Sequence, residues 1–185
     1  MSDASDKLLK QAFQARRENR LADARRDLVE AVEICRNAGI PLELAKALTG
    51  LGSIERDLQH SDAARQHYEE AVAIHRALGD ALALAHTVRH VADIHRHDGS
   101  REQAERCYQE ALEIYRRHER TPPLDLANAI RGLAILKDDA GERVEARSLW
   151  EEARELYTAT QVEAGVAESK RRLARLGRGQ MESGP

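Results

Sequence analysis

The chain repeats itself about every forty residues. Four segments align without internal gaps, at 22–34, 62–74, 102–114 and 144–156. Each carries an alanine, a large residue four positions later and a second alanine three positions after that. These sets are Ala24/Leu28/Ala31, Ala64/Tyr68/Ala71, Ala104/Tyr108/Ala111 and Ala146/Trp150/Ala153. A period of about 20 to 50 residues is typical of folds that stack one supersecondary unit on the next, so the repeat predicts a stacked architecture.

The spacing within each repeat predicts two helices, because apolar and small residues recur at steps of three and four. A further pair of residues marks the first helix of each unit: Leu8/Ala12, Leu48/Gly52, Val88/Ala92 and Ile130/Ala134. Alanine and leucine supply 51 residues, against 21 for valine, isoleucine and threonine together. This composition favours helix over sheet and excludes an all-β fold.

Glycine and proline mark the predicted helix ends. Gly39 and Gly79 follow second helices, where a left-handed cap suits glycine, and Pro41 and Pro123 open first helices. Gly99 and Gly141 mark the turn inside the third and fourth units.

A single domain is predicted over residues 5–176. Its units lie at about 5–40, 41–80, 81–120 and 123–160, and residues 162–176 copy the first helix of a fifth unit and form a capping helix. Residues 177–185 are predicted to be a disordered tail.

Each unit resembles the tetratricopeptide repeat (TPR) family in two features. These are the Gly/Ala of the first helix and the Ala, Tyr/Trp/Leu, Ala trio of the second. The period exceeds the family's usual length of about 34 residues and is similar to that of kinesin light chain and of some bacterial signalling regulators. The aromatic residue that the family carries late in the first helix is absent: Ala15, Glu55, His95 and Lys137 stand there. The resemblance implies an all-α fold, a right-handed α-solenoid of four TPR-like helix pairs plus a C-terminal capping helix.

The resemblance also implies a concave groove lined by the first helices. Carried over to this chain, the peptide-binding residues are Lys46, Arg56, His86, Arg89, Asp93, Arg96, Asn128, Arg131 and Arg171. Two rows at one-repeat spacing hold three arginines each: Arg89/Arg131/Arg171 and Arg16/Arg56/Arg96. A guanidinium presents a fixed fork of donors that matches a carboxylate. The rows therefore favour acidic groups on a partner, and the alternative is that they are solvated charges.

The leading hypothesis is a non-enzymatic protein–protein interaction scaffold that binds a peptide segment of a partner in the groove. One alternative is a sensory or regulatory module that binds a signalling peptide. Another is a self-associating structural protein, a homodimer through an uncapped N-terminal unit that carries Leu8, Leu9 and Phe13. No GxSxG motif or phosphate-binding glycine loop is found, so no enzyme and no cofactor are predicted.

Metal, nucleic-acid and membrane binding are not predicted. His86, His90, Asp93 and His97 share one helical face and include possible zinc or nickel ligands, but a polar groove wall is the preferred interpretation. The net charge of −3 gives no general attraction to nucleic acid or membranes. The longest apolar run is 81–85, no secretory signal is found and the two cysteines are far apart, so a cytoplasmic location is predicted.

Overall fold

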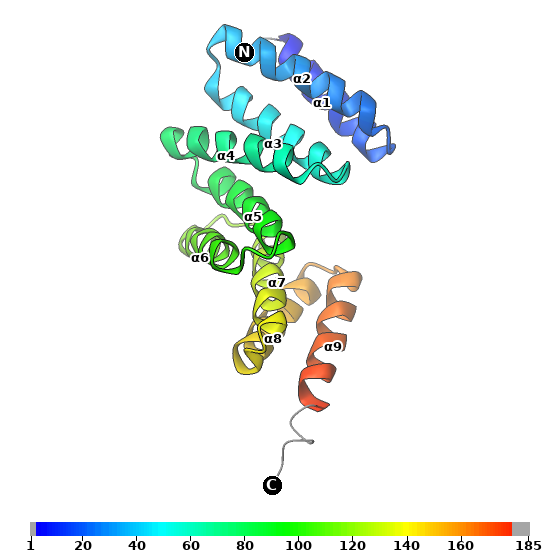
Figure 1. Cartoon of the computed structure of the whole chain (residues 1–185), viewed down its shortest axis with the longest axis vertical. Helices are drawn as coiled ribbons and strands as arrows, with labels where there is room; N and C mark the ends of the chain where they lie inside the picture. The colour runs from blue at the N-terminus through cyan, green and yellow to red at the C-terminus, as the bar shows by residue number, and fades with distance from the viewer. Residues whose placement is uncertain (1–2, 179–185) are drawn as a thin grey trace. The chain divides into compact units, whose positions relative to one another are not determined.

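The computed structural model describes residues 3–178, which fold almost entirely into helices. The helices are α1 (Asp3–Arg17), α2 (Leu21–Ala38), α3 (Pro41–Asp57), α4 (Ser61–Leu78), α5 (Ala81–His97), α6 (Arg101–Arg117), α7 (Pro123–Asp139), α8 (Arg143–Ala159) and α9 (Glu163–Arg178) (Figure 1). No strand occurs in this range, which confirms the predicted all-α fold of helix pairs with an additional last helix. None of these helices is long and apolar enough to cross a membrane.

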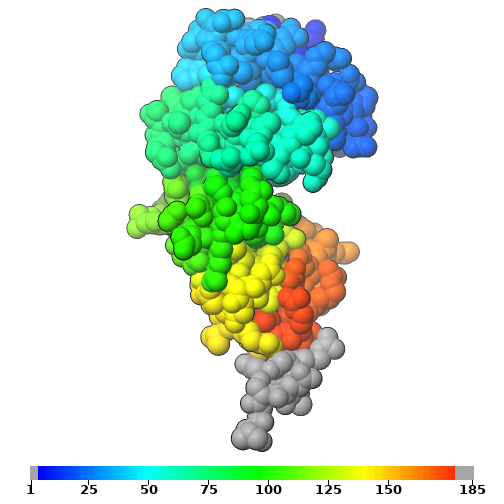
Figure 2. All heavy atoms as spheres, in the orientation of Figure 1, coloured from blue at the N-terminus to red at the C-terminus, as the bar shows by residue number. Residues whose placement is uncertain are grey.

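Contacts between helices group the described residues into two compact units, one ending at Ile94 and one beginning at His95. In the first unit, α1 packs on α2, α2 on α3, and α3 on α4; in the second, α6 packs on α7, α7 on α8, and α8 on α9. In Figure 2, which draws the atoms as spheres, colours that follow one another along the bar lie next to one another within each unit. Packing between chain neighbours is what a repeat fold requires. The single domain at 5–176 stays a prediction.

Residues in the left-handed region form the turns at regular positions. Gly39 and Gly79 cap α2 and α4, and Pro41 and Pro123 open α3 and α7, as the sequence predicts. The turn between the helices of a pair carries one residue with φ between 58° and 77°: Asn19, Gln59, Gly99 or Gly141. The two glycines were expected there. Asn19 and Gln59 at the same repeat position were not expected to adopt a positive φ. They show that the turn conformation recurs even in repeats that lack a glycine.

The repeated small and large residues form the core of each unit. All four leading alanines are fully buried, and the large residues that follow them are at most 4% exposed. Glycine allows close approach of the neighbouring helix. A Cβ atom placed on Gly132 of α7 would lie 2.4 Å from the Tyr108 ring of α6, and one on Gly52 of α3 would lie 2.9 Å from the Tyr68 ring of α4. Small residues on first helices therefore receive the large side chains of second helices.

In the first unit, a buried carboxylate occupies the position of the missing late aromatic residue. Glu55 of α3 accepts a hydrogen bond from Arg25 Nε at 2.7 Å, and its second oxygen lies 2.8 Å from His60 Nδ1. Burial alone would raise the pKa of Glu55, but the hydrogen bonds from His60 and Arg25 more than offset it, so the pKa lies below its ordinary value. An ion pair thus joins α2 of one helix pair to α3 of the next.

The second unit has the same arrangement with the charges reversed. Lys137 of α7 is buried, and its Nζ lies 2.6 Å from a Glu105 oxygen on α6, 2.7 Å from Glu142 and 3.2 Å from Glu145. Lysine, Glu105 and Glu142 stand where the first unit has glutamate, arginine and histidine. The contact between α2 and α3 therefore carries the opposite charge pattern to the contact between α6 and α7. If α3 were packed on α6 instead, Glu55 would meet the like charge of Glu105.

The last helix packs on α8 and is held at both its middle and its end. The Arg172 guanidinium lies 5.5 Å from the centre of the Trp150 ring, and Arg143 Nη2 donates to the Leu176 carbonyl at 2.8 Å. The predicted disordered tail is wrong for residues 177 and 178, which belong to α9. Arg143 thereby satisfies a carbonyl that has no partner within the last turn of α9. The rest of the predicted tail, 179–185, lies outside the described residues.

Candidate functional site

Eight of the nine predicted groove residues lie on first helices of their pairs and the ninth, Arg171, lies on the additional helix α9, so they form two sets. In the first unit, α3 and α5 carry Lys46, Arg56, His86, Arg89 and Asp93. In the second, the end of α5, α7 and α9 carry Arg96, Asn128, Arg131 and Arg171. Of the first set, all but Lys46 belong to one connected polar network.

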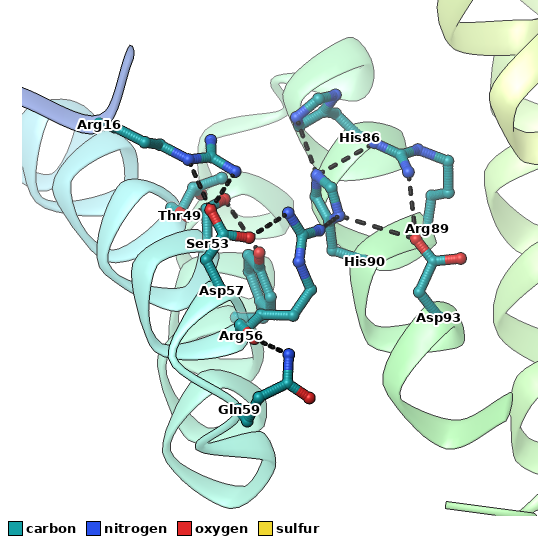
Figure 3. Close-up of polar contacts among 11 residues, drawn as sticks. Arg16, Thr49, Ser53, Arg56, Asp57, Gln59, His86, Arg89, His90 and Asp93 are labelled. Carbon is teal, nitrogen blue, oxygen red and sulfur yellow. Dashed lines mark hydrogen bonds and ion pairs between the residues drawn. The ribbon is translucent and has the colours of Figure 1, made fainter. Parts of the chain in front are cut away.

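This network joins α1, α3 and α5 (Figure 3). Arg16 of α1 donates from Nε to Asp57 Oδ2 at 2.8 Å, and Arg56 donates from Nη2 to Asp57 Oδ1 at 3.1 Å. Arg56 Nη1 also lies 3.0 Å from Nδ1 of His90 on α5. Two arginines therefore share one carboxylate. Asp57 was not predicted from the sequence, where its only signal is its place directly after Arg56.

His90 lies at the centre of the network and is 7% exposed. The Tyr68 ring of α4 stacks on it, with 5.1 Å between ring centres and 10° between planes. Its Nε2 lies 3.0 Å from Arg89 Nη2 and 3.3 Å from His86 Nε2. Burial, followed by the charges of the neighbouring arginines and His86, lowers the pKa of His90 well below 6.5. The imidazole is therefore neutral at pH 7.

Arg89 is 9% exposed and is already engaged within the unit. Its Nη1 donates to Asp93 Oδ2 at 3.2 Å, one turn further along α5. Its buried Nε has no hydrogen-bond partner. Arg89, which the sequence predicts to contact a partner, is thus largely desolvated, and its Nε–H group makes no hydrogen bond.

Hydroxyl groups fix the surroundings of this network. Ser53 Oγ lies 2.9 Å from Tyr68 Oη, which positions the ring that stacks on His90. Thr49 Oγ1 and Thr87 Oγ1, 3.4 Å apart, link α3 to α5. Burial raises the pKa of Tyr68, so its hydroxyl stays protonated at neutral pH. These contacts hold the imidazole in place from two neighbouring helices.

Lys46 lies apart from the network and is exposed on α3. It borders a cavity of about 190 Å³ whose other lining residues include Leu9, Phe13 and Arg16. Phe13 is 64% exposed. The first helices of this unit therefore present an apolar depression beside two cationic side chains.

The histidine-rich face of α5 does not assemble as a metal site in the described part of the chain. Among residues 3–178, no group of three or more His, Cys, Asp or Glu side chains is placed to hold a metal ion. His86 and His90 contact each other, and Asp93 pairs with Arg89. His97 is exposed at the end of the helix.

In the second unit, one predicted arginine is engaged and another is exposed. Arg131 of α7 pairs with Glu168 of α9 through two hydrogen bonds, at 2.6 Å from Nε and 3.1 Å from Nη2. Arg171 is exposed on α9. Charged side chains of α9 therefore pair with charged side chains of α7. Asp138 of α7 likewise accepts a hydrogen bond from Arg172 at 3.2 Å.

The two other predicted residues of this unit contact tyrosines of second helices. Asn128 Oδ1 accepts a hydrogen bond from Tyr157 Oη at 2.8 Å, and Arg96 Nε donates to Tyr108 Oη at 3.2 Å. Both interactions hold first and second helices together. Repeat-by-repeat alignment placed Asn128 and Arg96 on the expected helices. It did not show that both form hydrogen bonds with buried tyrosines.

Comparison with known proteins agrees with this architecture. A family model described as tetratricopeptide repeat matches residues 43–117 and, in an overlapping register, residues 80–159. No curated protein matches the chain.

Two solved structures are similar in fold. BtubC (BKLC) from P. vanneervenii has a TM-score of 0.76 at 20% identity; the match covers 85% of this chain but only 64% of that one. Nearly identical TPR-like repeats assigned to a kinesin light chain of Podosopora anserina give a TM-score of 0.74 at 16% identity, covering 99% of this chain and 90% of that one. These likenesses establish an all-α repeat solenoid of helix pairs.

Proposed function

Because the chain belongs to the tetratricopeptide repeat family, we propose that it is a non-enzymatic scaffold that binds a peptide segment of a partner protein. The segment lies against the first helices and carries acidic groups. A repeat fold suits this role, since each helix pair adds another strip of side chains to the same binding surface.

The excess of arginine over aspartate within the polar network of the first unit supports the acidic preference. Arg16 and Arg56 donate to Asp57, and Arg89 donates to Asp93. Leaving the histidines aside, three arginines and two aspartates leave one positive charge. Complementary charge on a partner favours both correct docking and fast association.

The accessible cations are the expected first contacts. Lys46 and Arg171 are exposed, and the Arg56 side chain is 33% exposed. Arg89 and Arg131 already pair with Asp93 and Glu168, so a partner carboxylate joins or replaces an existing pair there. Removal of Lys46 is therefore the cleanest perturbation, and Arg56, which also donates to Asp57, is more exposed than Arg89.

The test compares labelled acidic peptides with matched peptides in which Asn and Gln replace Asp and Glu. Fluorescence anisotropy at low salt and at roughly 0.3 M salt gives the affinity and its salt dependence. We expect tighter binding of the acidic peptide, with weaker affinity and a flatter salt dependence in Arg56→Gln and Lys46→Gln. Arg26→Gln is the matched control, because Arg26 is exposed on α2, a second helix. Equal affinity for both peptides, or an equal loss in the control, refutes the acidic groove.

Self-association is a second candidate, favoured by the exposure of Phe13 beside the apolar cavity on α1. A second copy would bury this side chain. Light scattering over a range of concentrations tests it: a dimer that Phe13→Ser dissociates supports it, and a monomer at every concentration refutes it. The regulatory-module alternative stays a prediction.

A further inference from the structure

We propose that α9 binds a helix of a partner protein, which takes the place of the second helix of a fifth pair. The partner helix is amphipathic and carries an acidic residue on the face that meets α9. This surface is separate from the groove of the proposed function, because it lies on the side of the helix that a second helix covers in the complete pairs. The equivalent positions of α3, α7 and α9 carry the argument.

Three positions, each about one turn from the next, form a stripe along every first helix. The stripe is Ala45/Leu48/Gly52 in α3 and Ala127/Ile130/Ala134 in α7. All six of these residues are buried. In α3, the Tyr68 ring of the following helix lies so close to Gly52 that an added Cβ atom would be 2.9 Å from it. The second helix of a pair therefore packs on this stripe.

In α9 the stripe is Ala167, Lys170 and Ala174, and all three residues are exposed. The preceding helix is in place, since α8 packs on α9 as α6 packs on α7. The difference is that no helix follows α9 among residues 3–178, and Figure 1 shows α9 at the edge of its unit. The exposed α9 stripe is therefore the side that a following second helix would cover.

A cleft of about 680 Å³ lies beside the α9 stripe. Its lining includes Arg154 and Thr158 of α8 and Glu163, Ala167 and Lys170 of α9. Alanine side chains are small and let another helix axis approach closely. An amphipathic helix that lays its apolar face into such a cleft uses anchor residues three and four positions apart. The shape of this surface thus suits a helix.

Lys170 determines the chemistry of the partner helix. The equivalent residues Leu48 and Ile130 are apolar and fully buried. A lysine covered by another helix needs a carboxylate, because an unpaired buried charge is costly. Arg154 adds a second positive charge, and neither cation forms an ion pair within the described chain. With Glu163, the cleft keeps an excess of one positive charge, which favours an acidic partner.

A second copy of α9 is a poor occupant of this surface. Lys170 and Arg171 lie at the middle of Glu163–Arg178. An antiparallel copy aligned along the whole helix would place these basic residues opposite one another, and like charges in contact oppose binding. A helix of another protein with an acidic residue at this point avoids the repulsion.

The pair formed by α3 and α4 shows where the acidic residue lies on the partner helix. In that pair, the Tyr68 ring lies against Gly52. Leu48, one turn earlier on α3, belongs to the same core cluster as Ala71, one turn later on α4. Because α9 has Lys170 in place of Leu48, the partner helix carries its acidic residue one turn after a large side chain.

The probe is a synthetic peptide that copies residues 61–78 of α4 with Ala71→Glu, and the matched peptide carries Ala71→Lys. Both are acetylated and amidated at their ends. The ¹⁵N-labelled full chain is titrated with each peptide, and its backbone chemical shifts are followed. We expect the glutamate peptide to bind with a dissociation constant of roughly 10–500 µM, because a short isolated helix must order on binding. The largest changes should fall at 167–174, and the lysine peptide should bind about tenfold more weakly or worse.

Variants of two exposed residues of the α9 stripe test the contacts. Lys170→Glu should reverse the preference, so that the lysine peptide binds more tightly than the glutamate peptide. Ala174→Leu should weaken the glutamate peptide about fivefold or more, because the larger side chain occupies the space of the peptide's tyrosine. Arg117→Gln is the control, since Arg117 is 79% exposed on α6, and it should change neither affinity. Equal affinity for the two peptides, or an unreversed preference in Lys170→Glu, overturns the proposal.

Other occupants give different results. A dimer in light scattering that Lys170→Glu dissociates would assign the α9 stripe to a second copy. Peptide binding that is gained only when residues 179–185 are deleted would assign it to that segment. Either result overturns the assignment to a partner helix. Changes confined to α1, α3 and α5 support the groove of the proposed function and overturn the site on α9, so the two proposals fail separately.

Discussion

Replacing Gly132 by alanine should destabilise the second unit, although alanine is the better helix former. A Cβ atom at this position would lie 2.4 Å from Cε1, 2.6 Å from Cζ and 2.7 Å from Oη of Tyr108. Ordinary contacts between such atoms are about 3.5 Å or longer, so the ring or the helix must move by roughly 1 Å. Tyr108 is fully buried and its hydroxyl accepts a hydrogen bond from Arg96, so the ring has little room to move.

The expected magnitude is the balance of two terms. Overpacking a close-fitting core costs about 1–3 kcal/mol, and the helix propensity of alanine over glycine returns about 1 kcal/mol. Because two ring atoms and the hydroxyl oxygen of Tyr108 fall inside contact distance, the cost should lie toward the upper end of its range. We expect Gly132→Ala to lower the free energy of unfolding by about 1–2 kcal/mol.

Urea unfolding followed by the fluorescence of Trp150 measures this effect. Trp150 is the chain's single tryptophan and is buried in the same unit. In a Tyr108→Leu background the clash is absent, so the alanine should be neutral or stabilising by up to about 1 kcal/mol. Gly177→Ala, where a Cβ meets no atom within 4 Å, is the control. The same cost in both backgrounds, or no cost in either, would refute the interlocking of glycine and tyrosine.

Three further predictions concern charged groups. The free energy of unfolding should fall as pH drops below about 6.5, by up to about 1.4 kcal/mol per pH unit, because His90 takes up a proton in the unfolded state that the folded state disfavours. Thermal melts from pH 7.5 to 5 measure this, and the melting temperature should depend less on pH in His90→Gln. Lys137→Met should cost about 1–3 kcal/mol at pH 7, because the surrounding glutamates then lose their buried counter-ion and repel one another; an unchanged free energy of unfolding in urea contradicts this. Arg143→Gln should speed amide hydrogen exchange in the last turn of α9 while leaving α6 unchanged, since Arg143 holds the Leu176 carbonyl.

The helix pairs and their cores were predictable because periodic positions determine them. Ala64, Tyr68 and Ala71 recur in phase with their counterparts, and the structure buries all three. The left-handed turns at Gly99 and Gly141 were predictable for the same reason, whereas Asn19 adopts that conformation without a glycine to mark it.

The pairing of the groove arginines was not predictable from the repeat. Reading one position per repeat aligned Arg89 with Arg131 as equivalent contacts. Arginine side chains are long and reach carboxylates in other rows, so Arg89 pairs along its own helix with Asp93 and Arg131 pairs across to Glu168. Similarly, Glu55 replaces a family aromatic residue, and only the structure shows the ion pair that makes its burial tolerable.

Chemical-shift mapping of an acidic peptide on the assigned backbone spectrum locates the proposed binding surface residue by residue. We expect the largest changes in the first unit to fall on α1, α3 and α5, around Lys46, Arg56 and His90, and to vanish with the matched amide peptide. Changes concentrated on α2 and α4, or an equal response to both peptides, would contradict it.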